Sequence, residues 1–281
     1  MVLSNKNVYK YMAAAAEAGV HLVRVGTKEM AFRPQRFDEN FTRTLEFFHQ
    51  QFPDVHVNFV VHFTHPDEML ERDAANQFVR NEAGYYRWLA PVRAALDAVQ
   101  RFDFVSVENQ TPIIARVNDD ALSLRILQEE LRRNNVKPKY LFQCREIEGH
   151  TAFAVPVEKA WALHNESQKG LSDTARSRFT MSTEAGKLEV VSVIDGPPGG
   201  PHHQWPNAVT NVFGEGLVIM KVHRSPNSAQ SHGDLIIARR NPEALWMSDY
   251  EDRIVYDGRH EGDGKYKRLA VVPRINDLLV A

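Results

Sequence analysis

Glu108, Asn109 and Gln110 are consecutive polar residues whose types could do binding chemistry. They follow a short apolar run, Phe104–Val107, and a helix is expected to begin near Asp119. Carboxylate and amide groups supply both hydrogen-bond donors and acceptors, and in α/β proteins ligands gather at the carboxyl ends of parallel strands. The pattern predicts a ligand-binding loop at a strand end. The alternative is an Asx-type turn that only caps the strand.

Four histidines could supply metal ligands. His62 and His65 stand three apart at another expected strand end, and His202 and His203 are adjacent. A metal site needs at least three converging ligands. The spacing of these residues does not establish that convergence, so no metal is predicted.

Cys144 is the only cysteine of the chain. It could be a nucleophile, but a thiol at the end of an apolar strand is more often packed and inert. A single cysteine excludes an intrachain disulfide, and it excludes any cluster or zinc site built from cysteines of this chain alone. A reducing compartment fits this usage, so a cytoplasmic location is expected.

Composition narrows the function classes. The 281 residues are 43% hydrophobic, enough for one large domain or one and a half. A net charge of −2 without a long basic run argues against a nucleic-acid partner. No apolar run is long enough to span a bilayer, so no membrane partner is expected. No internal repeat of fixed period is recognised.

Apolar runs alternate with stretches of helical spacing in the first part of the chain. The predicted strands are 20–27, 55–63, 104–107 and 140–144. Three predicted helices begin at Ser4, Asp38 and Pro156. Two more are predicted over 68–101, broken near Gly84, and one over 120–133 with Leu122 on its inner face. Such alternation indicates a parallel sheet with right-handed crossovers. The expected α/β fold is a partial parallel (β/α) barrel over residues 1–170.

The last third of the chain changes character. Lys187–Asp195 is a predicted strand that runs into the loop Gly196–Pro201, whose glycines permit close backbone approaches. Short β-like segments follow at 209–212, 216–222, 235–238, 245–248 and 253–256. Residues 171–281 are therefore expected to form a small β-rich extension. Asp195 could bind a cation or a substrate ammonium there, or serve only as a turn residue.

Six groups of residues occur in a characteristic order: Arg24–Thr27 with Pro34–Arg36, His62–Glu68, Asn109–Thr111, Val117–Asp119, Pro138–Cys144 and Val193–Pro197. Together with Asn241–Tyr256, they resemble the lysine 2,3-aminomutase family of radical SAM enzymes over nearly the whole chain. The resemblance implies a barrel of the radical SAM type. It also implies migration of an amino group between adjacent carbons of a small amino-acid-like substrate.

The resemblance also implies cofactors and site residues. The family reaction begins with a 5′-deoxyadenosyl radical made from S-adenosylmethionine at a [4Fe–4S] cluster, and pyridoxal phosphate carries the amino group. By resemblance, His62, His65, Asn109 and Gln110 lie on the S-adenosylmethionine side. Asp195 matches an aspartate that binds the substrate ammonium.

Three features depart from the family pattern. The C-x3-C-x2-C motif that holds the cluster is absent. His202 stands where the family has the lysine that forms the pyridoxal phosphate Schiff base, and an imidazole cannot form that imine, so pyridoxal phosphate dependence is doubtful. Arg145 replaces a second substrate-binding aspartate, which indicates an anionic or otherwise different substrate.

The resemblance places Met1–Ser4 in the middle of the family's barrel, after its first strands. The chain is therefore expected to be the C-terminal portion of a longer or split protein, with the cluster supplied by missing sequence or a partner chain. Two hypotheses follow. The first is a radical SAM isomerase, inactive as this chain alone because the cluster cysteines are absent. The second is a non-catalytic relative or partner subunit that keeps the scaffold. Homo-oligomer formation is left open by the sequence.

Overall fold

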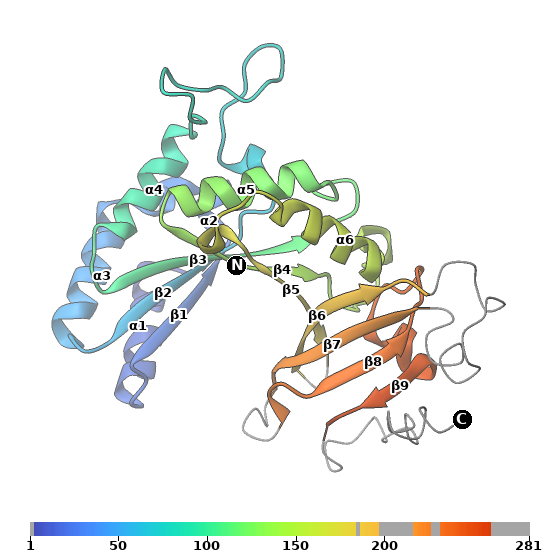
Figure 1. The fold of residues 1–281 in the computed structure, drawn as a ribbon. Coiled ribbons are helices and arrows are strands. Elements are labelled where there is room, and N and C mark those ends of the chain that lie inside the picture. The colour runs from blue at the N-terminus through green and yellow to red at the C-terminus, as the bar shows by residue number, and fades with distance from the viewer. Residues whose placement is uncertain (1–2, 184–185, 197–215, 226–230, 260–281) are drawn as a thin grey trace, which may run out of the picture. The chain divides into compact units, whose positions relative to one another are not determined.

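The computed structural model describes residues 3–183, 186–196, 216–225 and 231–259 (Figure 1). The helices are α1 (Asn5–Glu17), α2 (Glu29–Phe32), α3 (Glu39–Gln51), α4 (Ala90–Gln100), α5 (Ala121–Arg133) and α6 (Val157–Gln168). The strands are β1 (Leu22–Thr27), β2 (His56–Val61), β3 (Val105–Ile113), β4 (Val136–Gln143), β5 (Arg178–Thr183), β6 (Gly186–Ile194), β7 (Leu217–Arg224), β8 (Leu235–Arg239) and β9 (Ile254–Asp257). The protein is therefore α/β, with parallel and antiparallel strand pairs.

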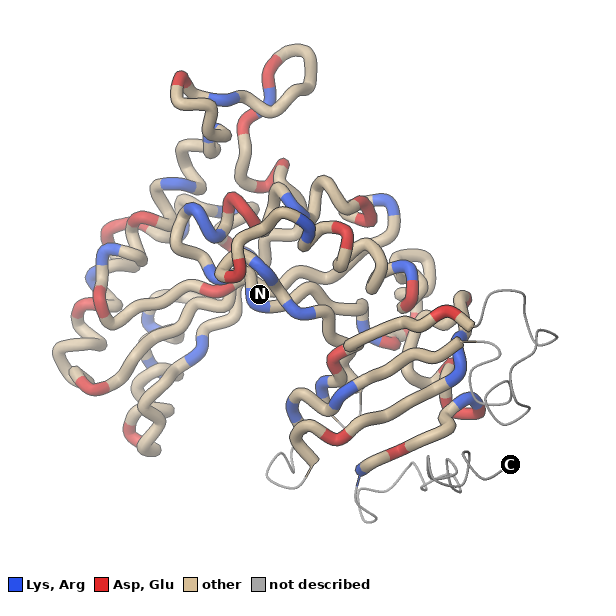
Figure 2. The backbone as a smooth tube through the Cα atoms, viewed as in Figure 1, with Lys and Arg blue, Asp and Glu red and all other residues tan. Residues whose placement is uncertain are grey.

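The chain divides into two compact units. The first comprises residues 1–111, 122–140 and 170–177, and the second comprises 112–121, 141–169 and 178–281. Lys and Arg are interspersed with Asp and Glu along both units (Figure 2). Within the described ranges, no helix combines the length and the apolar character needed to cross a membrane. The sequence-based division into 1–170 and 171–281 stays a prediction.

The first unit contains the expected parallel strands. β1 pairs with β2 and β2 with β3, all parallel, with Val25 opposite Phe59 and Phe59 opposite Val107. Side chains alternate between the two faces of a strand. On β2, Val57, Phe59 and Val61 are at most 1% exposed and belong to one core with α1, α3, α4 and α5. The helices therefore cover one face of these strands.

The opposite face of the same strands is polar. We call it the polar face. Its polar side chains are Arg24, His56, Asn58, Ser106, Glu108 and Gln110 on β1 to β3, His62 directly after β2 and Lys139 on the neighbouring β4, and the apolar Val60 lies among them. The strand register places Arg24 opposite Asn58 and Glu108 opposite Val60. Since side chains alternate, the burial of the odd-numbered β2 residues under helices directs these polar groups to the other side.

Local signals set the helix boundaries. Asp38 accepts a hydrogen bond from the Phe41 amide at 2.8 Å, which confirms it as the N-cap of α3. The α3 residues Leu45 and Phe48 are fully buried. Burial of each such side chain stabilises the fold by about 1.5–3 kcal/mol.

The expected orientation of Leu122 in α5 is wrong. Leu122 is 64% exposed, whereas Leu124, Leu127 and Leu131 are fully buried. Residues two apart on an α-helix point in nearly opposite directions because a turn takes 3.6 residues. The three buried leucines decide which side of the helix faces the core, and they turn Leu122 to solvent.

Residues 70–88 contradict the predicted helices over 68–101. Only α4 is an α-helix there, and residues 70–88, which we call the arm, extend away from the strands (Figure 1). Isolated antiparallel bridges join Leu70 to Trp88, Arg72 to Phe78 and Arg80 to Tyr86.

The arm contains two copies of one loop. In the first, the Arg72 guanidinium stacks on Phe78 at 3.9 Å from the ring centre and donates to the Asn76 carbonyl at 2.6 Å. In the second, Arg80 stacks on Tyr86 at 3.9 Å and donates to the Gly84 carbonyl at 2.6 Å. The spacing is the same in both, so the arm is an internal repeat of eight residues, and the expectation of no internal repeat is wrong.

The second unit contains the predicted β-rich region. β5 to β9 pair antiparallel in sequence order. The segments expected at 216–222, 235–238 and 253–256 are β7, β8 and β9, and the segment at 209–212 lies outside the described residues. The strand expected at 245–248 is wrong, because Asp249 accepts hydrogen bonds from the Leu245 and Trp246 amides and holds a 3-10 turn there.

Candidate functional site

Glu108 lies at the centre of a charged cluster on the polar face. Arg24 on β1 donates to its Oε1 at 2.5 Å, and Lys139 on β4 donates to Oε1 at 2.9 Å and to Oε2 at 2.8 Å. The Glu108 side chain is 8% exposed, against 34% for Arg24 and 28% for Lys139. Three strands thus bring two cations to one buried carboxylate, and we call these residues the Glu108 triad.

A layer of hydrogen-bonding side chains lies beside this triad. Ser106 Oγ accepts a hydrogen bond from Asn58 Nδ2 at 2.8 Å and lies 2.9 Å from His56 Nε2. Asn58 Oδ1 is buried and has no hydrogen-bond partner within the described part of the chain. The polar face therefore continues along the strands as hydrogen-bonding groups.

A second charged group marks the end of β2. Lys28 Nζ donates to the His62 carbonyl at 2.8 Å, to Thr64 Oγ1 at 2.9 Å and to Glu68 Oε1 at 2.7 Å. Burial and the neighbouring Lys28 ammonium lower the pKa of His62, and the Glu68 carboxylate opposes them. The His62 imidazole is therefore biased toward its neutral form.

Asn109 organises the backbone beside the polar face. It is 2% exposed, and its Oδ1 accepts from the Phe63 amide at 2.8 Å. Its Nδ2 donates to the Phe63 carbonyl at 3.1 Å and to Thr111 Oγ1 at 2.7 Å. These contacts occupy both amide protons and the carbonyl oxygen, so Asn109 holds the end of β2 against β3.

The expectation that the strand stops at Glu108 is wrong. β3 continues to Ile113, and Asn109 still pairs with Val61 of β2. The ladder persists through the polar residues because the neighbouring strand satisfies their backbone groups. Gln110, half-buried on the polar face, has no side-chain hydrogen bond to any described residue, which leaves its amide for a ligand.

His65 caps the 3-10 turn Pro66–Glu68. Its Nδ1 accepts a hydrogen bond from the Asp67 amide at 3.2 Å. A neutral imidazole that accepts at Nδ1 carries its proton on Nε2. His65 can therefore present an N–H donor at the end of β2.

Asp195, the predicted ammonium ligand, lies at the end of β6 in the second unit. Its side chain is 90% exposed and forms an ion pair with Arg240. Arg240 also donates to Glu158 Oε2 at 2.7 Å. A substrate ammonium at Asp195 would share the carboxylate with this guanidinium.

Glu158 and Gln143 anchor the segment 241–250 in the same unit. Glu158 Oε1 accepts from the Asn241 amide at 2.7 Å and from the Tyr250 hydroxyl at 3.4 Å. Gln143 is fully buried and donates to the Leu245 carbonyl at 2.9 Å. Glu158 lies on α6 and Gln143 on β4, so these two elements hold the segment 241–250 in position.

The remaining predicted residues are Arg145, Cys144 and His202. Arg145 is exposed after β4. Cys144 is half-buried, and burial raises the pKa of its thiol, which disfavours the thiolate that a nucleophile needs. His202 and the loop that precedes it lie outside the described residues.

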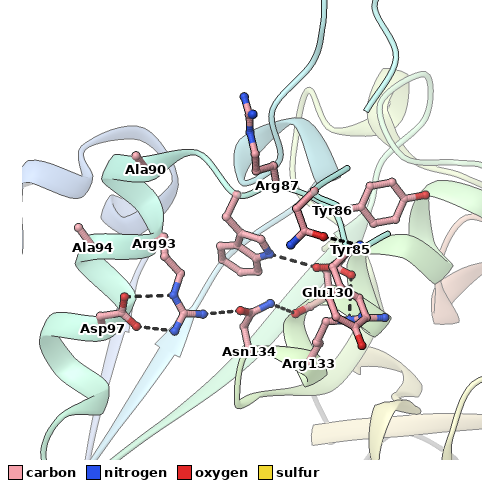
Figure 3. Close-up of a pocket in the computed structure, with 12 residues that line it drawn as sticks. Tyr85, Tyr86, Arg87, Ala90, Arg93, Ala94, Asp97, Glu130, Arg133 and Asn134 are labelled. Atoms are coloured by element: carbon pink, nitrogen blue, oxygen red, sulfur yellow. Dashed lines mark hydrogen bonds and ion pairs between the residues drawn. The ribbon is translucent and has the colours of Figure 1, made fainter. Parts of the chain in front are cut away.

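A cavity of about 630 Å³ lies between the arm, α4 and α5 (Figure 3). On its wall, Glu130 accepts from Trp88 Nε1 at 3.2 Å and pairs with Arg133 at 3.2 Å. Burial raises the pKa of Glu130, and the Trp88 hydrogen bond opposes that shift. The charged groups that line the cavity all have protein partners, Arg93 with Asp97, Glu130 with Arg133 and Arg87 with Glu71, and no predicted site residue lines it. The polar face is therefore the stronger candidate.

The described residues contain no group of three or more His, Cys, Asp or Glu side chains arranged to hold a metal ion. An iron–sulfur cluster of the four-iron type is held by several cysteine thiolates, and the chain has one cysteine. Its own residues do not fit that cluster.

Three charged residues with several partners were not predicted from sequence: Arg24 and Lys139 on the polar face, and Glu158 in the second unit. Arg24 and Lys139 stand among apolar strand residues, and Glu158 follows the apolar start of a helix. A charge at a position expected to be buried is the signal that could have found them, because such charges are rarely buried without a partner.

Comparison with known proteins reveals sequence relatives, although no protein family model matches the chain. A protein of Aquifex aeolicus, provisionally named L-lysine 2,3-aminomutase, is 28% identical over 258 residues, which are 90% of this chain and 58% of that protein. The L-lysine 2,3-aminomutase of Bacillus subtilis is 26% identical over 66% of this chain and 34% of its own length. The glutamate 2,3-aminomutase of Clostridioides difficile is 27% identical over 50% of this chain and 27% of its own length. The chain thus spans little more than half of the A. aeolicus relative.

Proposed function

Since this chain is a relative of the lysine 2,3-aminomutases, we propose that its polar face binds an amino-acid-like substrate for radical migration of an amino group. The first unit would then form part of a (β/α) barrel, with the polar face lining its interior. The activity belongs to the complete catalytic assembly, of which this chain supplies the substrate-facing strands.

The Glu108 triad is the observation that carries this proposal. Charged groups are costly on a sheet face unless they are paired or serve a ligand. Here Arg24, Glu108 and Lys139 come from three strands and meet on the face that the helices leave uncovered. A polar interior with fixed charges is suited to holding a zwitterionic substrate.

The proposal gives roles to the residues at the strand ends. Gln110 and His65 would contact S-adenosylmethionine, because each has a hydrogen-bonding group that no described residue of the chain binds. Asn109 would act indirectly by fixing the end of β2. When bound at its cluster, S-adenosylmethionine supplies the radical, and the protein's part is to position and shield the reactants.

The single cysteine favours a second candidate function. The chain cannot hold a [4Fe–4S] cluster by itself, so a non-catalytic relative that keeps the scaffold would show the same residues. The enzyme would receive its cluster ligands from additional sequence or from another chain, whereas the non-catalytic relative would have none.

Anaerobic reconstitution tests the two candidates directly. The 281-residue chain and the protein expressed from the reading frame extended upstream are each reconstituted with iron and sulfide. Bound iron, bound sulfide and the 5′-deoxyadenosine formed are then measured. We expect the extended protein to bind a cluster and cleave S-adenosylmethionine, and the 281-residue chain to do neither. If neither protein does, the enzyme proposal fails and the non-catalytic relative is supported.

A matched pair of variants tests the site. In the active protein, Gln110→Ala should lower 5′-deoxyadenosine formation by about tenfold, since a lost hydrogen bond to a charged ligand is worth about 1.5–3 kcal/mol. Gln77→Ala, on the exposed arm, should change the rate by less than about twofold. Equal effects of the two variants would contradict the assignment of the polar face.

A further inference from the structure

We propose that Arg24 and Lys139 together form a carboxylate-binding site, with Glu108 holding the two cations in place. This inference rests on the proposed function for the nature of the ligand, an amino-acid-like carboxylate. It adds a charge requirement that neither the sequence motifs nor the relatives' names assign to these residues.

The geometry brings the two cations close together. Arg24 Nη2 and Lys139 Nζ both donate to the same atom, Glu108 Oε1, at 2.5 and 2.9 Å. Their nitrogens are therefore near enough for one carboxylate to contact both. Arg and Lys donate several hydrogen bonds each, so binding Glu108 leaves donors for a second anion.

The exposed fractions of the three side chains determine which charge a ligand contacts. The Glu108 side chain is 8% exposed, whereas about a third of each cation's side chain remains accessible. The triad carries two positive charges against one negative charge. A ligand that reaches the polar face therefore meets a net positive site with its counter-charge buried below.

The surrounding charges reinforce this sign. Lys137 lies two residues before Lys139 on the same face of β4 and is exposed. Lys28 and Glu68 pair with each other at the end of β2. The polar face is therefore net positive in a chain whose formal net charge is −2, which is a local departure that favours an anionic group.

Glutarate and its neutral diamide, glutaramide, test the site without any cofactor. The two probes have the same length and differ in charge, and their affinities for the full chain can be measured by calorimetry or ligand-observed NMR. We expect glutarate to bind at least about tenfold more tightly than glutaramide, the ratio that 1.4 kcal/mol represents. Equal affinities in the wild-type protein would overturn the proposal.

Three variants separate this site from general charge effects. Lys139→Met should weaken glutarate binding by about tenfold, and Lys139→Arg should restore most of it. Lys137→Met removes the same charge two residues away on the same face and should change affinity by less than about twofold. Equal effects of Lys137→Met and Lys139→Met would contradict a specific site.

Glu108→Gln provides a test of sign. The glutamine amide oxygen can still accept hydrogen bonds from both cations and keep them in place, while the competing negative charge is gone. Glutarate should therefore bind more tightly than in the wild type, while glutaramide binding does not change. A variant that merely loosened the fold would weaken both. Weaker glutarate binding by Glu108→Gln would overturn the proposal. Because these measurements need no cluster, the carboxylate site and the radical activity can fail independently.

Discussion

Asn109 illustrates how a residue in a ligand-like motif can serve the strand instead. Its amide satisfies the backbone N–H and the carbonyl of Phe63, both in a buried setting. A lost partner for such a buried group costs about 1–3 kcal/mol. The residue is therefore expected to matter for stability as well as for any ligand.

Replacing Asn109 by Ala should lower the free energy of unfolding by about 1–3 kcal/mol, because the buried Phe63 amide loses its partner while the Phe63 carbonyl keeps Thr111 Oγ1. Urea denaturation measures the change. Asn40→Ala, on an exposed position of α3, is the matched control and should lie within about 0.5 kcal/mol of the wild type. An Asn109→Ala protein as stable as the wild type would contradict this stabilising role.

The pair of His62 and Lys28 makes a prediction about pH. Burial and the Lys28 charge both lower the pKa of His62 from its ordinary 6.5. Lys28→Met should therefore raise this pKa, and the unpaired Glu68 should raise it further. NMR titration of the His62 imidazole measures the shift, and Lys10→Met on the exposed side of α1 should cause none.

The sign of the linked stability change follows from the same shift. When the pKa of a histidine is lower in the folded state, the unfolded chain binds the proton more readily, so protonation favours unfolding. The wild type should therefore lose stability as the pH falls through 6.5 toward the folded-state pKa. Lys28→Met should reduce this part of the acid-induced loss. An unchanged His62 titration would refute the coupling.

At the scale of elements, the arm shows why composition misled the helix prediction. Residues 70–88 contain many residues that favour helices, yet the structure uses Arg–aromatic stacking and short turns instead. Each loop closes on itself, since the stacked arginine also binds a carbonyl within the loop. Contacts of this kind override weak helix propensities.

The two copies of the loop should have similar energetics. Double-mutant cycles for Arg72 with Phe78, and for Arg80 with Tyr86, should each give a coupling energy of about 0.5–1 kcal/mol. Amide hydrogen exchange of the arm reports local stability where global unfolding is insensitive. A coupling in one copy with none in the other would contradict the repeat as an energetic unit.

At the scale of the whole molecule, the two compact units differ in what holds them. The first is built around parallel strands with helices on one face, and the second around antiparallel strands. In the second unit, Glu158 links α6 to Arg240, Asn241 and Tyr250. A buried carboxylate with so many partners is costly to remove.

Glu158→Gln tests whether the units respond separately. It should destabilise the second unit by about 3 kcal/mol, because the Arg240 guanidinium loses its buried counter-charge. Hydrogen exchange should accelerate in α6 and β6–β8 while β1–β3 keep their protection. Glu148→Gln, at an exposed position of the same unit, should have no such effect. Equal acceleration in both units would show that they unfold as one.

Much of the architecture could be predicted from the sequence, because strand alternation, helix caps and turn residues act over a few neighbours. The Asp38 cap, the parallel strands and the positions of β7 to β9 are such cases. The resemblance to the aminomutases likewise came from short ordered motifs, and the relatives confirm it.

The charged centre of the candidate site was decided only by tertiary structure. Arg24 and Glu108 are 84 residues apart, and Lys139 follows Glu108 by another 31. No local pattern encodes which charges meet across parallel strands, since that depends on strand register and on which face the helices cover. The same sequence therefore predicted a polar strand end at Glu108, and only the fold placed a buried carboxylate there between two cations.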